Sequence, residues 1–121
     1  MLNVCYSPKY FAHTHTNSME KLKAIADQLS LGDFVKFHEP ADLDCNLLYE
    51  IHSEKYVNAV LTGEPTKLAT IAGFKPWCEQ LKNAVLSINA GQIRAAELAF
   101  EHGISANIAQ GFHHATYDFG G

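Results

Sequence analysis

Two adjacent histidines near the end of the sequence are the residues best suited to do chemistry. His113 and His114 follow a short apolar run at 104–109 and a glycine, Gly111. Such a run predicts a strand buried on both faces, and the glycine predicts a loop that needs close backbone approach. Neighbouring imidazoles can hold different protonation states near neutral pH, so that one accepts a proton while the other donates one. The pattern therefore predicts a proton-transfer site in a loop after a strand.

The elements that must position this loop are those of an α/β sheet. Strands are expected at 2–6, 34–37 and 104–109, where short apolar runs are bounded by turn residues. In open parallel sheets the functional crevice lies beyond the carboxyl ends of the strands. We therefore expect the loop after the first strand, residues 9–16, to emerge at the same edge as the histidine loop.

Four helices are expected between these strands, and capping residues set their limits. Asn17 with Glu20 resembles a capping box, Pro76 occupies a favoured first-turn position, and Gly103 ends the longest helix. The other expected starts are capped by Asp42 or Asp44 and by Ser53, and Gly63 is expected to end the helix that Ser53 begins. Residues 64–73 are expected to be irregular or weakly helical. The small residues around 90–96 allow close packing of the longest helix, or a kink within it.

The composition excludes several classes of protein. The 121 residues, 47% of them hydrophobic and 18% charged, suit one globular domain at most. A net charge of -4 without a basic stripe argues against nucleic-acid binding. No apolar run approaches the roughly 18 to 20 residues needed to cross a bilayer. We expect a soluble protein that binds neither nucleic acid nor membranes.

The cysteines indicate a reducing compartment. Cys5, Cys45 and Cys78 are odd in number and far apart, and the sequence shows neither a Cys-x-x-Cys pair nor a secretory leader. We interpret them as reduced, mostly buried thiols of a cytoplasmic protein.

The loop after the first strand contains two further histidines. His13 and His15 are separated by one residue, so an extended segment can present both rings on one side, as a metal site requires. We favour the simpler interpretation that these histidines are solvated or bonded to backbone carbonyls. Phe74 and Trp77 lie at the expected start of the longest helix. They either line a ligand channel or, as is more usual for large aromatic residues there, pack in the core.

Several segments together resemble the histone deacetylase superfamily, in particular its bacterial deacetylase-like and class IV members. Gly-Phe-His-His-Ala at 111–115, followed by Tyr-Asp-Phe-Gly-Gly at 117–121, is similar to the active-site loop of that family. The resemblance extends to residues 5–10, 51–57 and 95–99. It implies an arginase/deacetylase-like α/β fold, of which residues 1–121 form an incomplete N-terminal portion of an open, mostly parallel sheet flanked by helices.

The resemblance also implies a chemistry, zinc-dependent hydrolysis of acyl amides such as acetyl-lysine or acetylpolyamines. His113 would lie nearest the metal-bound water, with His114 beside it, as the general base and acid. The residues expected to line the substrate channel are Tyr10, His13, His15, Phe112 and Gly120. His52 falls in a structural turn between two helices. Asp118 matches a variable loop position and is not assigned to orient a histidine.

The metal ligands of the family are absent from this sequence. They form an Asp-x-His pair and a further aspartate, which in the family follow the Gly-Gly that ends this chain, as does the catalytic tyrosine. We therefore expect zinc only in the full-length family domain, and an isolated chain that is truncated and inactive. An exposed sheet or a swapped helix is expected to produce a homo-oligomer.

Two alternatives remain open at this stage. One is a non-catalytic binding or assembly module that uses the N-terminal fold of the deacetylases to hold a partner. The other is a small metal-binding protein in which His13, His15, His113 and His114 converge on one ion.

Overall fold

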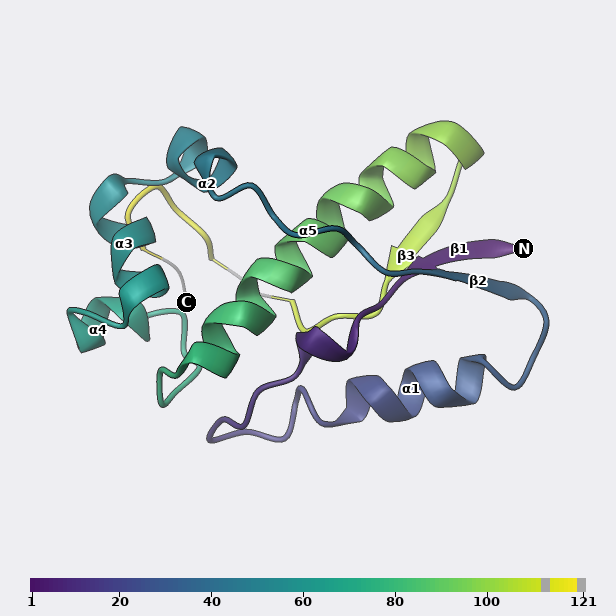
Figure 1. The fold of residues 1–121 in the computed structure, drawn as a ribbon, viewed down its shortest axis with the longest axis horizontal. Coiled ribbons are helices and arrows are strands. Elements are labelled where there is room, and N and C mark those ends of the chain that lie inside the picture. The colour runs from purple at the N-terminus through teal and green to yellow at the C-terminus, as the bar shows by residue number, and fades with distance from the viewer. Residues whose placement is uncertain (112–113, 120–121) are drawn as a thin grey trace.

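The computed structural model describes residues 1–111 and 114–119 and shows an α/β fold with an open parallel sheet (Figure 1). The three strands are β1 (Leu2–Cys5), β2 (Val35–His38) and β3 (Ser105–Asn107), in the order β2-β1-β3. Both pairings are parallel, and Val4 lies between Phe37 and Ala106. The predicted fold class is confirmed.

Six helical segments connect and flank the strands in the part of the chain that the structure describes. They are a short 3₁₀ helix η1 (Pro8–Tyr10), α1 (Lys21–Leu29), α2 (Asn46–Ile51), α3 (Glu54–Thr62), α4 (Thr66–Ala69) and α5 (Glu79–His102). The four expected helices correspond to α1, α2, α3 and α5. The short helix α4 lies in the region expected to be irregular or weakly helical.

The long helix α5 organises the molecule. It contacts β1, β3 and η1, and Figure 1 shows it on one side of the strands with α1 on the other. The helices α2, α3 and α4 gather at the far end from the N-terminus, near the first turns of α5. The C-terminal segment returns to this end of the molecule, so residues that follow β3 meet the helices before α5.

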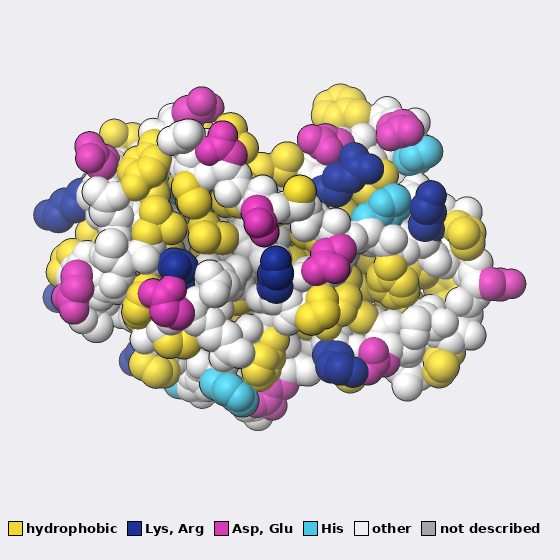
Figure 2. Space-filling view, in the orientation of Figure 1, with side chains coloured by type: hydrophobic (Ala, Val, Ile, Leu, Met, Phe, Trp, Pro, Cys, Tyr) yellow, Lys and Arg dark blue, Asp and Glu magenta, His cyan; other side chains and the backbone are white. Residues whose placement is uncertain are grey.

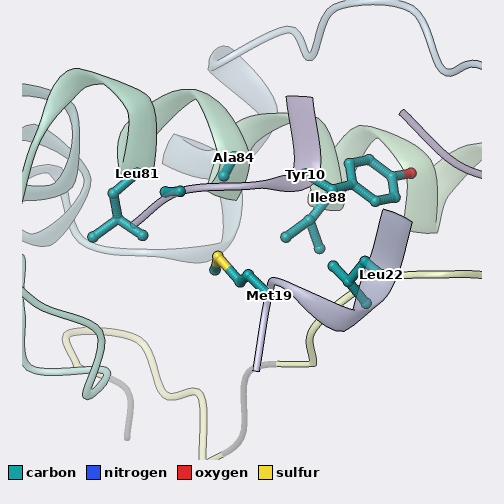
Figure 3. Packing of buried hydrophobic residues seen from close by; sticks show 7 residues of the cluster. Tyr10, Met19, Leu22, Leu81, Ala84 and Ile88 are labelled. Atoms are coloured by element: carbon teal, nitrogen blue, oxygen red, sulfur yellow. The ribbon is translucent and has the colours of Figure 1, made fainter. Parts of the chain in front are cut away.

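The core joins the N-terminal segment to α5. Buried residues of α5 recur at helical spacing and face buried residues of η1 and α1 (Figure 3). The main buried cluster consists of Tyr10, Ala12, Met19, Leu22, Leu81, Ala84 and Ile88. A smaller cluster of Cys5, Ala95 and Leu98 fixes β1 against the second half of α5. Both clusters hold the carboxyl end of β1 in place.

The cysteines are free thiols. Cys5 is buried, and burial raises the pKa of its thiol, while Cys45 and Cys78 are half-buried. Cys78 has a role that sequence reasoning missed, because its Sγ accepts a hydrogen bond from the backbone N–H of Leu81 at 3.3 Å and so caps α5.

Two predicted helix starts are wrong. The capping box of Asn17 and Glu20 does not form, since α1 begins at Lys21 and Glu20 makes no side-chain cap. The helix α5 begins at Glu79 rather than near Pro76, because Cys78 is extended and takes the cap position. The helix α2 begins close to Asp44, which accepts from the N–H of Asn46 at 3.0 Å, but Cys45 takes the cap position without a side-chain cap. Ser53 caps α3, and glycines with positive φ, Gly63 and Gly103, end α3 and α5 as expected.

The strand before the histidine loop is shorter and less buried than predicted. The residues of β3 are half-buried, and Ile104 before it is 67% exposed. The reason is its position at the edge of the three-stranded sheet, where one side of β3 has no neighbouring strand among residues 1–111 and 114–119.

The visible surface carries mixed charge. Figure 2 shows basic and acidic side chains interspersed on one face, with hydrophobic ones over α2, α3 and β2. Exposed hydrophobic residues of these elements include Leu47, Tyr49, Ile51 and Phe37. In the part of the chain that the structure describes, no helix combines the length and apolarity required to cross a bilayer.

Candidate functional site

The histidine loop emerges at the predicted edge of the sheet. The backbone N–H of Ile108, just after β3, donates to the carbonyl of Cys5 at the end of β1, at 2.9 Å. The loops that follow these two strands therefore start side by side, as expected for parallel strands. Of the predicted site residues, Phe112, His113 and Gly120 lie outside the described residues.

His114 is exposed and has a left-handed backbone, with φ +56°. Histidine tolerates this region better than branched residues do, yet a non-glycine residue there costs on the order of 1 kcal/mol or more. Such a conformation persists only where the surrounding structure holds it, so the contacts of the loop matter.

His52 supplies one of these contacts. Its ring Nδ1 lies 2.8 Å from the carbonyl oxygen of Thr116, and because a carbonyl only accepts, Nδ1 carries the proton and donates. The neighbouring N–H of Ser53 donates to the carbonyl of Tyr117 at 2.7 Å. The turn between α2 and α3 thus holds residues 116–117. His52 lies in the predicted turn between two helices, but its ring bonds the segment after β3 rather than tying those helices together, and nothing in the sequence identified this partner, 64 positions away.

Replacing His52 by alanine is expected to loosen this loop. The loss of one hydrogen bond of ordinary strength, worth about 1 kcal/mol, should speed exchange of the Ser53 amide proton roughly fivefold. Hydrogen exchange followed by NMR measures this effect. The control is His13→Ala, which also removes an imidazole, one that is exposed and lies against the ring of Phe11. Equal exchange at Ser53 in both variants would show that His52 does not hold the loop.

Tyr10 is buried beneath this edge of the sheet. It is 1% exposed, and its hydroxyl donates to Oδ1 of Asn107 at 2.7 Å, which links η1 to β3. Burial raises the pKa of the phenol, so Tyr10 stays neutral and remains a donor. Its ring also forms part of the wall of a surface hollow that includes His13.

His13 and His15 are both exposed. The ring of His13 lies edge-on to Phe11, with centroids 4.8 Å apart, and Nδ1 of His15 bonds the carbonyl of Lys75 at 3.3 Å. His15 is therefore bonded to a backbone carbonyl, as in the simpler interpretation.

A zinc site does not fit the side chains that the structure places. Among residues 1–111 and 114–119, no three His, Cys, Asp or Glu side chains gather closely enough to hold a metal ion. A catalytic zinc needs about three protein ligands around one point. The site of four converging histidines stays a prediction, because it includes His113, which is outside those ranges.

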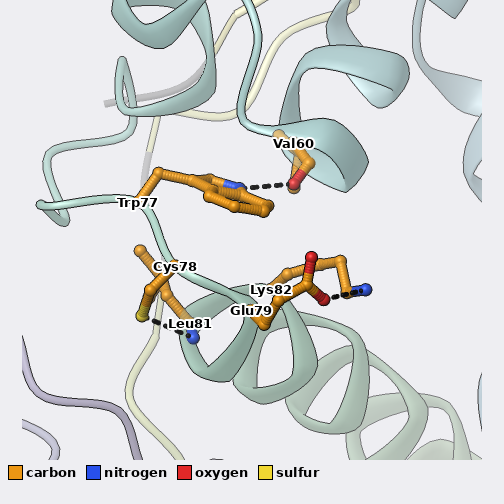
Figure 4. A network of polar contacts seen from close by, with 6 residues as sticks. All are labelled: Val60, Trp77, Cys78, Glu79, Leu81 and Lys82. Atoms are coloured by element: carbon orange, nitrogen blue, oxygen red, sulfur yellow. Dashed lines mark hydrogen bonds and ion pairs between the residues drawn. The ribbon is translucent and has the colours of Figure 1, made fainter.

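An apolar hollow of about 150 Å³ lies beside the histidine loop. Its wall includes Ala115 of the loop, together with Phe74 and Trp77. Both aromatic residues line this hollow, and Phe74 also packs against the main buried cluster, so core packing holds for Phe74 while a ligand channel stays a prediction. The indole N–H of Trp77 donates to the carbonyl of Val60 at 2.7 Å, which fixes the ring against α3 (Figure 4).

Comparison with known proteins gives two similarities of limited extent. No model of a protein family matches the chain. It is 32% identical over 124 residues to an uncharacterized protein of Picosynechococcus sp., covering 97% of this chain and 41% of that protein. It is 35% identical over 89 residues to Histone deacetylase 2 of Arabidopsis thaliana, covering 69% of this chain and 23% of that protein. The chain thus spans less than half the length of either curated relative.

Proposed function

We propose that the chain is the N-terminal part of a histone deacetylase-like amide hydrolase and supplies its proton-transfer loop. The observation that carries this proposal is the similarity to Histone deacetylase 2 of Arabidopsis thaliana over 69% of the chain. The open parallel sheet supports it, because the loops after β1 and β3 start side by side where such sheets place their functional crevice. Three free thiols agree with a reducing cytoplasm.

In this proposal His113 and His114 hold and move protons at the scissile amide of an acylated amine. Phe112 and Gly120 line the approach to them. His13 and His15 are exposed and suit a rim that meets substrate, whereas Tyr10 supports the rim from the core through its bond to Asn107. His52 positions the loop through its hydrogen bond to the carbonyl of Thr116.

Two histidines alone are too weak a catalyst for amide hydrolysis. General acid–base catalysis contributes about 10²–10⁴-fold, whereas enzymes accelerate such reactions by at least about 10⁶-fold. A zinc ion would supply the remaining activation of water, and its ligands do not come together in the described residues. We propose, on the family resemblance, that the ligands belong to the rest of a full-length deacetylase-like domain and that the isolated chain is inactive.

The test is an assay of the isolated chain with zinc and a fluorogenic acetyl-lysine peptide. Hydrolysis is expected to equal that of the matched double variant His113→Ala/His114→Ala. Zinc-dependent hydrolysis that survives purification and is lost in the double variant would contradict the inferred location of the metal ligands.

The exposed sheet edges favour a second candidate, an assembly module. The outer edges of β2 and β3 have no strand partner in the described part of the chain. Two large exposed hydrophobic residues precede β3 in the chain, Phe100 in the last turns of α5 at 96% and Ile104 at 67%. Unpaired edges next to exposed apolar side chains favour pairing with another strand or copy.

Self-association through this surface is expected to produce oligomers at tens of micromolar protein. Light scattering coupled to size exclusion measures the mass, and Phe100→Lys/Ile104→Lys is expected to shift it toward the monomer. A matched control is Ile25→Lys, since Ile25 is an exposed residue of α1 on the opposite side of the strands. A monomeric unmodified chain would contradict this candidate.

A further inference from the structure

The apolar hollow beside the histidine loop has the size and shape of a small-molecule site. It lies between α3, α4 and the first turns of α5, with a volume of about 150 Å³. Aromatic walls come from Tyr56, Phe74 and Trp77, and aliphatic walls from Val60 and Val85. Apolar cavities of about this volume accept a benzene ring. The hollow is therefore large enough for one aromatic ring.

Its main wall is preformed. The hydrogen bond from Trp77 to the carbonyl of Val60 fixes one edge of the indole. The other constraint is Gly63, where an added Cβ would lie 2.6 Å from the Trp77 ring, so the indole packs directly on the backbone that ends α3. Sites for small molecules are usually formed before the ligand arrives, and this wall meets that requirement.

The hollow carries a positive charge on its wall. Lys82 is the charged residue of the described lining, and no carboxylate belongs to that lining. The Lys82 side chain is only 23% exposed, and its Nζ lies 2.6 Å from Oε2 of Glu79 (Figure 4). Glu79 is 70% exposed and lies outside the wall. Burial raises the pKa of Tyr56, so its phenol is neutral and can donate a hydrogen bond.

We propose that this hollow binds a small aromatic carboxylate. The ring packs against Trp77 and Phe74, and the carboxylate meets Lys82 in place of the exposed Glu79. A cationic ligand is disfavoured, because it would bring a second positive charge to Lys82 in an apolar site. This site is independent of the proposed hydrolase function, since binding requires neither hydrolysis nor a metal.

The fluorescence of Trp77, the one tryptophan of the chain, reports binding directly. The unmodified protein is titrated with 3-phenylpropanoate, 3-phenylpropanol and 3-phenylpropylamine, which share a ring and differ in the end group. The carboxylate is expected to bind with a Kd in the millimolar range or tighter, about tenfold more tightly than the alcohol, with the amine weakest. No change in emission with the carboxylate, or an amine that binds equally well, would overturn the proposal.

Two substitutions locate the site. Lys82→Met keeps the apolar stem and is expected to weaken carboxylate binding about tenfold, with alcohol binding within about twofold of the original. Lys23→Met is the matched control, because Lys23 also forms an ion pair of 2.6 Å, with Asp27, away from this hollow. Ala69→Phe fills the hollow and should abolish the response to all three compounds. Unchanged carboxylate binding in Lys82→Met, or a loss in Lys23→Met, would contradict the assigned site. The selectivity of the unmodified chain decides the matter if a variant fails to fold.

Discussion

Gly91→Ala is expected to destabilise the protein by about 2–4 kcal/mol. Gly91 lies inside α5, where an added Cβ would overlap the hydroxyl of Tyr10 and lie 2.8 Å from Oδ1 of Asn107. Tyr10 is 1% exposed, so its ring has no room to move aside. The better helix propensity of alanine returns only about 1 kcal/mol. Urea unfolding followed by circular dichroism measures the change.

Two further variants test the reason for this effect. Gln92→Ala, at the adjacent exposed position of α5, is expected to change stability by less than about 0.5 kcal/mol. Combining Gly91→Ala with Tyr10→Phe should cost less than the sum of the two changes, because the phenol oxygen is the atom that overlaps. A Gly91→Ala protein as stable as the original would mean that Tyr10 does not pack against α5 in this way.

Trp77→Ala is expected to cost about 3–5 kcal/mol, the range for removing a large aromatic side chain. The substitution removes the packing on Gly63 and the hydrogen bond to Val60, which together hold the start of α5 against α3. Trp77→Phe retains part of the ring and should lose about 1–2 kcal/mol. Circular dichroism is the suitable probe, since these variants lack tryptophan.

A matched control separates this packing from general hydrophobicity. Phe100 is an aromatic residue of α5 that is 96% exposed, so Phe100→Ala should alter stability by less than about 0.5 kcal/mol. If Trp77→Ala and Phe100→Ala had equal effects, Trp77 would not join α3 to α5, and the preformed wall of the hollow would be in doubt.

Local sequence signals predicted the sheet because each strand is a short apolar run bounded by turn residues. They also predicted where α3 and α5 end, since glycine is the residue that best adopts the positive φ at Gly63 and Gly103. The start of α5 was missed because the sequence offered Pro76, a common first-turn residue, and gave no sign that Cys78 would cap. A cysteine is an unusual cap.

The site was less predictable because its contacts join distant parts of the chain. Tyr10 and Asn107 are 97 positions apart, and His52 and Thr116 are 64 apart. The glycine and alanines within the last helix did signal close packing, and Gly91 confirms this by its contact with Tyr10. Nothing in the sequence indicated the hollow beyond its aromatic residues, since its walls come from the four helices α2 to α5 and from the loops that join and follow them.

A chimera tests most directly whether the histidine loop belongs to a deacetylase site. A segment of this chain that includes the histidine loop replaces the matching segment of Histone deacetylase 2 of Arabidopsis thaliana, to which the chain is 35% identical over 89 residues, and folding is checked by circular dichroism. With zinc and an acetyl-lysine peptide, the chimera is predicted to hydrolyse the amide, and His113→Ala and His114→Ala are each predicted to lower kcat by about 100-fold or more. Lys67→Met, at an exposed position of α4, is the neutral control. A folded chimera that is inactive, or whose hydrolysis is unaffected by both histidine substitutions, would contradict the proposed role of this loop.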